Sequence, residues 1–104
     1  MELTKDADKL LCLIYKEYLK RRKCGVRKTQ AIHFEDPATL VNEFLSGENP
    51  DDVADLLFDL ARVGFVVTYI DASFYLTDKA IIYMENRFKN GLLEVADFIS
   101  KFIP

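Results

Sequence analysis

The chain has 104 residues, 50% of them hydrophobic and 12% aromatic, which is enough for one packed core and too little for two ordinary domains. No segment approaches the roughly 20 consecutive apolar residues that span a bilayer. Met1 is followed by charged residues rather than by a basic and then apolar export signal. We therefore expect one cytoplasmic domain covering residues 1–104.

The net charge of −3 hides a strong partition along the sequence. Residues 1–34 carry nine Lys or Arg and four Asp or Glu, whereas residues 35–104 carry five and thirteen. A polarised surface is the expected result, with one basic and one acidic region.

The two cysteines, Cys12 and Cys24, fall in or next to one expected helix, which would hold them roughly 18 Å apart. They cannot form a disulfide there, and Cys12 is expected to pack in the core. His33 is the only histidine and no CxxC motif is present, so the sequence supports neither a metal site nor a cofactor.

The first helix is expected over residues 7–23, capped by Thr4 or Asp6 and ended by Gly25. Its apolar face would comprise Leu11, Ile14, Tyr15, Tyr18 and Leu19. The segment from Val26 to Phe34 follows, and Ala31, Ile32 and Phe34 in it suit a short strand.

Two helix openings follow, Asp36-Pro37 and Asn49-Pro50, because an Asp or Asn cap followed by proline is typical of a helix start. The first helix of this pair would end at Gly47 and the second at Gly64, which predicts a helix-turn-helix arrangement. The buried side of the second would comprise Val53, Leu56, Leu57 and Leu60.

Phe65–Ile70 and Phe74–Leu76 form the expected hairpin, with its turn at residues 71–73. A helix capped by Thr77 or Asp78 would run to about Phe88. The last helix, residues 92–103, carries an apolar arc of roughly 160°. An arc this broad indicates contacts on two sides, and the dimer contact expected there comprises Leu92, Val95, Phe98, Ile99 and Phe102.

The order helix, strand, helix, helix, hairpin, helix over residues 7–88 resembles the winged-helix superfamily. Leu60 to Val66 looks like a recognition helix running into the wing, and Tyr75 to Lys79 looks like the exit from the wing. The additional C-terminal helix, residues 92–103, is similar to that of small single-domain bacterial winged-helix proteins and of the MarR and PadR regulators. The resemblance implies an α+β winged helix-turn-helix with a short three-stranded antiparallel sheet, and it implies DNA binding through the third helix.

The exposed side of that third helix is predicted to be negatively charged, which is unfavourable for binding DNA. The exposed positions are predicted to be Arg62 and four carboxylates, Asp51, Asp52, Asp55 and Asp59. Between residues 35 and 59 there are eight acids and no Lys or Arg, whereas DNA binders place cations against the phosphates.

A basic segment offers another route to nucleic acid. It comprises Lys20, Arg21, Arg22, Lys23, Arg27 and Lys28. If four to six of these contacted phosphates, log affinity would fall with log salt at a slope of about −4 to −5. The same charges could instead bind an acidic protein surface or stabilise the end of the first helix.

No phosphate-binding glycine loop or GxSxG motif is present, and His33 has no neighbouring nucleophile, so the sequence gives no support for an enzyme. Our first hypothesis is a non-enzymatic winged-helix regulatory module that acts through protein contacts, as a homodimer or with a regulatory partner. The alternative is a DNA-binding transcriptional regulator that uses the basic segment.

Overall fold

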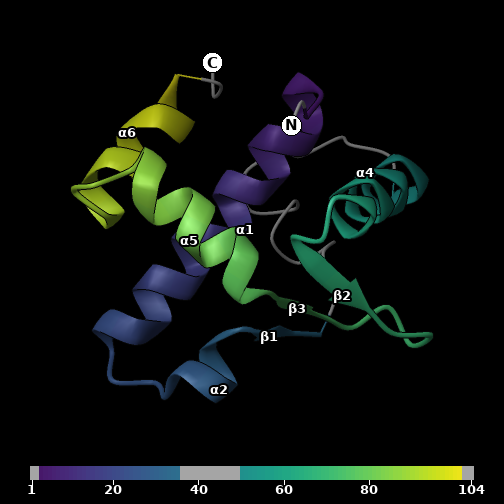
Figure 1. Cartoon of the computed structure of the whole chain (residues 1–104), viewed down its shortest axis with the longest axis horizontal. Coiled ribbons are helices and arrows are strands. Elements are labelled where there is room, and N and C mark those ends of the chain that lie inside the picture. Colours follow the sequence, from purple (N-terminus) through teal and green to yellow (C-terminus); the bar gives the residue numbers. More distant parts are fainter. Residues whose placement is uncertain (1–2, 36–49, 102–104) are drawn as a thin grey trace.

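The computed structural model describes residues 3–35 and 50–101, and places helices and a small sheet in one arrangement (Figure 1). The elements are α1 (Lys5–Lys23), α2 (Lys28–Ala31), β1 (His33–Phe34), α4 (Pro50–Arg62), β2 (Val66–Thr68), β3 (Phe74–Leu76), α5 (Asp78–Arg87) and α6 (Leu92–Ser100). The mixture of helices with one antiparallel sheet confirms the α+β class. The helix predicted over residues 36–47 lies outside the described residues.

Helix α1 begins at Lys5, two residues before the predicted start, and its cap is Thr4, one of the two predicted capping residues. The Thr4 hydroxyl accepts the Ala7 N–H at 3.2 Å, which satisfies one of the donors that every helix start leaves open. Gly25 follows the helix with a φ of +90°, a backbone conformation that side chains with a Cβ avoid. The Val26 N–H then reaches back to the Arg21 carbonyl at 3.0 Å and closes the helix end.

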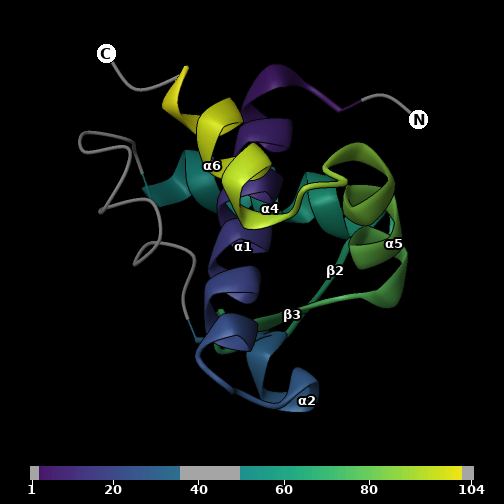
Figure 2. The same cartoon turned by 90° about the vertical axis from the view of Figure 1, so that its left-hand side faces the viewer.

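Helix α1 is the centre of the molecule rather than an amphipathic helix on its surface. Every residue from Leu10 to Tyr15 is buried, and α1 packs against α2, α4 and α6 (Figure 2). A helix that is buried around its full circumference must be covered by several neighbours. The single apolar face expected from the sequence is therefore too narrow.

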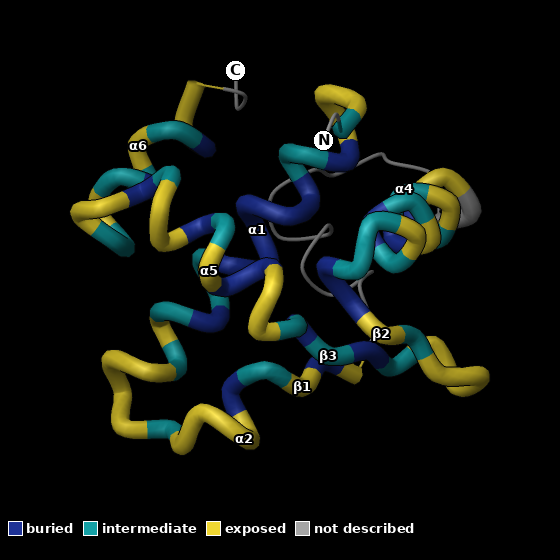
Figure 3. Tube along the Cα trace, viewed as in Figure 1, coloured by how far each residue is buried: buried dark blue, intermediate teal, exposed yellow. Residues whose placement is uncertain are grey.

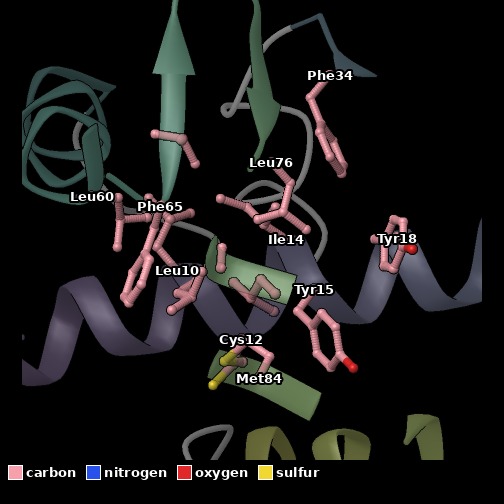
Figure 4. Packing of buried hydrophobic residues seen from close by; sticks show 14 of the residues in the cluster. Leu10, Cys12, Ile14, Tyr15, Tyr18, Phe34, Leu60, Phe65, Leu76 and Met84 are labelled. Carbon is pink, nitrogen blue, oxygen red and sulfur yellow. The ribbon is translucent and has the colours of Figure 1, made fainter. Parts of the chain in front are cut away.

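The core divides around α1. Leu10 and Ile14 point toward Phe65 and Leu76 at the sheet, while Cys12 lies beside Met84 of α5 (Figure 4). Burial raises the pKa of the Cys12 thiol to about 12, because the thiolate would lose its hydration there. The prediction that Cys12 packs in the core is confirmed, and both Cys12 and Cys24 are free thiols.

The sheet has the order β1-β3-β2 and is antiparallel throughout. His33 and Phe34 of β1 pair with Tyr75 and Phe74 of β3, and the Phe34 and Phe74 rings stack at 5.1 Å. The short three-stranded antiparallel sheet predicted from the sequence is confirmed. Its place beside α4 and α1 is shown in Figure 1.

The junction from α4 into the hairpin also follows the prediction. Gly64 has a φ of +85° and donates its N–H to the Ala61 carbonyl at 3.0 Å, while the Phe65 N–H reaches the Leu60 carbonyl at 2.9 Å. These two hydrogen bonds are the glycine-type stop of a helix. On the other side of the hairpin, the Thr77 hydroxyl accepts the Ala80 N–H at 3.2 Å and caps α5.

The short strand expected between Val26 and Phe34 is present, but it is limited to the end of that segment. Lys28–Ala31 forms one helical turn, α2, and only His33 and Phe34 pair with the sheet. The Ala31 N–H donates to the Arg27 carbonyl at 2.8 Å, and the guanidinium of Arg21 donates to the carbonyls of Ala31 and His33. These bonds satisfy backbone groups that a longer strand would have paired with β3.

Within residues 3–35 and 50–101, no helix is both long enough and apolar enough to cross a membrane.

Candidate functional site

The solvent-facing side of α4 is acidic, as the sequence predicts. Asp52 and Asp55 are exposed, and Asp59 is half-buried with its carboxylate 3.1 Å from Arg62. The side chain of Asp51 is not among those described. On the opposite side Val53, Leu57 and Leu60 are buried and Leu56 is half-buried. The helix therefore presents an acidic face. Among the described residues, Arg62 pairs with Asp59 on this face, and Asp52 and Asp55 have no ion pair.

The basic segment splits into structural and exposed members. Arg21 is built into the fold: one Nη donates to the carbonyls of Ala31, at 3.2 Å, and of His33, at 2.6 Å. Its guanidinium lies 4.3 Å from the centre of the Phe34 ring and its Nε lies 3.5 Å from Glu17. A guanidinium held by these contacts is not available to a partner.

Two further cations of the segment have partners within the chain. Arg22 donates to the Val26 carbonyl at 3.1 Å. Lys28 lies 3.1 Å from the Asp78 carboxylate, and the hydrogen bond to that carboxylate raises the pKa of Lys28. Lys20, Lys23 and Arg27 are exposed. We name these three residues the basic end, because they surround the end of α1 and the start of α2.

The basic end and the acidic face of α4 lie at different ends of the molecule. The end of α1 and α2 lie at the lower left in Figure 1, and α4 lies at the upper right. Figure 2 also separates α2 from α4 along the vertical axis. The Debye length is about 8 Å at physiological ionic strength, and the molecule extends over 32 × 32 × 28 Å. The cations of the basic end therefore do not neutralise the acidic face.

An apolar pocket that the sequence analysis missed lies beside the acidic face. Its volume is about 160 Å³. It is lined on one side by Ala54, Leu57 and Phe58 of α4 and on the other by Thr68, Tyr69, Ile70 and Ala72 of the hairpin. Two apolar residues beside polar ones in the sequence could have indicated this pocket: Phe58 precedes Asp59, and Ile70 precedes the turn residue Asp71.

The rim of this pocket is unusually apolar for a surface. Phe58 is 55% exposed, Tyr69 is half-exposed and Ile70 is fully exposed. The tip of the hairpin is exposed in Figure 3, where it projects beyond the body of the molecule. Contiguous exposed apolar side chains of this kind mark interaction surfaces more often than isolated ones do.

Helix α6 uses its apolar residues mainly inside the molecule. Val95 and Ile99 are buried, and α6 packs against α1. Leu92 and Phe98 are half-buried, and the Phe98 ring lies 5.5 Å from Phe88. Of the five expected dimer contacts, Val95 and Ile99 thus offer no surface to a second copy, because the chain itself covers them. Phe102 lies outside the described residues.

The outer face of α6 presents a residue that the sequence analysis did not select. Leu93 is 82% exposed. It lies one residue before Glu94 and four before Asp97, which pairs with Lys101 at 3.8 Å. A contact between two copies through α6 would therefore involve Leu93 rather than Val95 or Ile99.

The outer surface of the sheet carries three ring side chains. His33 of β1 and Tyr69 at the end of β2 flank Tyr75 of β3, with ring centres 5.6 and 6.1 Å from it. His33 is exposed on an outer strand of the sheet. Cross-strand packing accounts for the three rings. Among residues 3–35 and 50–101, no group of three or more His, Cys, Asp or Glu side chains could hold a metal ion.

No protein-family model, curated protein or solved structure matches this chain significantly.

Proposed function

We propose that this chain is a non-enzymatic regulatory module of winged-helix architecture that binds a protein partner through the acidic face of α4. The observation that carries the proposal is the charge of that face. Asp52 and Asp55 are exposed on the helix that in winged-helix proteins enters the DNA major groove, and carboxylates there would repel the phosphates. A partner with a basic surface would be attracted instead.

The arrangement of elements supports the architecture. Helix α4 ends at Gly64 and leads directly into a hairpin, β2 and β3, which leads into α5. Strand β1 completes the sheet on the far side of β3. A helix followed by an antiparallel hairpin and a first strand on its outer edge is the order that the winged-helix proposal requires.

The proposal can be tested by site-specific photocrosslinking in cells that express the protein. A photoreactive residue at position 55 should crosslink to a partner protein, and the same residue at Glu85, which is exposed on α5, should not. Excess wild-type protein should compete with the crosslink, and the double variant Asp52→Lys/Asp55→Lys should not compete. Equal competition by both proteins would exclude the acidic face as the binding surface.

DNA binding through the basic end is the second candidate, because Lys20, Lys23 and Arg27 are exposed around the end of α1 and the start of α2. With Arg21, Arg22 and Lys28 engaged inside the chain, three phosphate contacts remain rather than six. The expected slope of log affinity against log salt is then about −3. Titration of mixed duplex DNA at about 50 mM salt and above would test this, with Lys20→Gln/Lys23→Gln/Arg27→Gln compared with Lys89→Gln. Failure to bind at the lowest salt would eliminate it.

A homodimer is the third arrangement to test, and light scattering after gel filtration measures it directly. Leu93→Asp changes an exposed residue of α6, whereas Ile99→Asp would place a charge in the core and unfold the chain. Ile82→Asp, which changes an exposed residue of α5, is the matched control. A dimer that dissociates in the Leu93 variant alone supports assembly through α6, and a strict monomer at high micromolar concentration excludes it.

A further inference from the structure

The pocket between α4 and the hairpin has the size of a single side chain. Its volume of about 160 Å³ is smaller than the roughly 300 to 1,000 Å³ of sites that take drug-sized ligands or cofactors. One leucine or isoleucine side chain would fill it. The pocket is therefore suited to an anchor residue on a larger molecule and not to a free cofactor.

The chemistry of the lining fixes the character of that anchor. The apolar part of the lining comprises Ala54, Leu57 and Phe58 on the α4 side and Ile70 and Ala72 on the hairpin side. Among the described residues that line the pocket, Thr68 and Tyr69 carry a hydroxyl group. An aliphatic side chain gains the most from this setting, because burial removes apolar surface from water on both partners.

On each side of the pocket an exposed aspartate follows a lining residue in the sequence: Asp55 follows Ala54, and Asp71 follows Ile70. Asp55 is exposed on α4 within one turn of Phe58. Across the pocket Asp71 is exposed at the hairpin turn, where its carboxylate accepts the Ser73 N–H at 3.1 Å and the Ser73 hydroxyl at 2.5 Å. These hydrogen bonds lower the pKa of Asp71 and so favour its charged form. An occupant that carries cations on each side of its anchor would be complementary to both carboxylates.

From this combination we infer that the pocket receives one large aliphatic side chain from a segment of the partner protein in which lysine or arginine flanks that side chain on both sides. The inference rests on the proposed function, since it names the part of the partner that the acidic face would bind. The charges would bring the segment to α4 and the hairpin, and the aliphatic anchor would hold it there.

Three synthetic peptides separate the anchor from the charge. They are fluorescein-labelled Gly-Lys-Lys-Leu-Lys-Lys-Gly, the same peptide with glycine in place of leucine, and the same peptide with glutamate in place of every lysine. Binding to the full chain is measured by fluorescence anisotropy, and the site is located by ¹H–¹⁵N correlation spectra of the labelled protein. We expect the leucine peptide to bind at least about ten-fold more tightly than the glycine peptide and to shift the amides of Phe58, Thr68 and Ile70.

Matched variants of the protein locate the anchor. Phe58→Ser removes an aromatic side chain from the α4 side of the pocket. Ile82→Ser removes an apolar side chain of nearly equal exposure, 58% against 55%, from α5. The Phe58 variant should lose most of the preference for leucine over glycine, and the Ile82 variant should keep it. Because both residues are exposed, both variants should retain the wild-type pattern of core amide signals.

A filled pocket gives an independent check. Ala54→Leu projects a larger side chain into the space between α4 and the hairpin, and it should weaken the leucine peptide to the affinity of the glycine peptide. Asp55→Asn should weaken both lysine peptides by a similar factor, because it removes charge and leaves the apolar lining intact. Glu85→Gln is its control on α5.

The outcomes distinguish this inference from the function on which it rests. Equal binding of the leucine and glycine peptides, with both weakened by Asp55→Asn, would leave the acidic face as a binding surface and overturn the anchor. Absence of binding by either lysine peptide at millimolar concentration would overturn both. Tight binding of the leucine peptide with spectral shifts confined to the basic end or α6 would also overturn the anchor.

Discussion

Arg87 near the end of α5 forms a two-pronged ion pair with Asp8 in the first turn of α1. One Nη contacts Oδ1, and the other donates to Oδ2 at 2.9 Å. The guanidinium also lies 4.9 Å from the centre of the Phe88 ring and 4.7 Å from that of Phe98. The pair therefore joins α1, α5 and α6 at one point, and its two side chains are only 26% and 21% exposed.

Asp8→Asn should destabilise the protein by about 1–2 kcal/mol, because it leaves the partly buried guanidinium without its carboxylate. Asp6→Asn, in the same turn but exposed, should change stability by less than about 0.5 kcal/mol. Urea unfolding followed by circular dichroism measures both. Equal effects of the two substitutions would show that helix-dipole charge, and not the ion pair, is the source of the stabilisation.

Arg21→Ala should cost about 2–3 kcal/mol. The substitution leaves the carbonyls of Ala31 and His33 without a donor and removes the cation from the face of Phe34. Arg21→Lys should recover only part of this, because an ammonium cannot match the planar contacts of a guanidinium. Lys20→Ala, at an exposed neighbouring position, is the control and should be close to neutral in the same unfolding experiment.

Stability should fall as the pH rises from about 9 to about 12. Cys12 has a pKa of about 12 in the folded protein against 9.0 for an ordinary thiol, and the pKa of Tyr15 rises from 10.0 to about 12, both chiefly through burial. In this range the unfolded chain releases protons that the folded chain keeps, so alkali favours unfolding.

Thermal melts at pH 8, 9, 10 and 11 would measure this loss. In Cys12→Ala the melting temperature should fall less steeply with pH than in wild type, even if the substitution changes the melting temperature at pH 8. Cys24→Ala, at an exposed thiol, should leave the slope unchanged. The same burial predicts that at pH 8 a thiol reagent modifies Cys24 and reaches Cys12 only after unfolding. Modification of both thiols at the same rate in the folded protein would contradict the burial of Cys12.

Ala72→Gly should stabilise the protein by about 0.5–1 kcal/mol. Ala72 has a φ of +72° at the hairpin turn, a conformation that costs a residue with a Cβ roughly 1–2 kcal/mol. Glycine would adopt it without strain. Part of this gain is lost because glycine makes the unfolded chain more flexible. Ala72→Val should destabilise, since a β-branched residue is still less compatible with positive φ. Differential scanning calorimetry of the three proteins would rank them, and a lower midpoint for the glycine variant would refute the strain.

The elements that the sequence predicts well are those whose signals are local. Gly64 stops α4, Thr4 and Thr77 cap their helices, and the alternation around Asp71 forms the hairpin, because in each case the determining contacts lie within a few residues. The acidic face of α4 was predicted for the same reason: helical periodicity alone separates Asp52 and Asp55 from Val53 and Leu57.

What the sequence could not reveal depends on contacts between distant residues. The run from Leu10 to Tyr15 looked like part of one apolar face, but α6, some 80 residues later, buries its other side. From the sequence Arg21 is one cation of a basic segment, but in the fold α2 and β1 each bring a carbonyl to its guanidinium. The pocket arises only where α4 meets the tip of the hairpin, and no local pattern encodes that meeting.

The central position of α1 has a consequence for synthesis. This helix leaves the ribosome well before Val95 and Ile99, which lie some 80 residues later and help to bury it. Until they emerge, the apolar run from Leu10 to Tyr15 lacks part of its cover, and closing contacts over so long a separation is slow compared with forming the helix itself. We expect nascent chains stalled before residue 92 to expose this run to chaperones, and chains that include α6 to withdraw it.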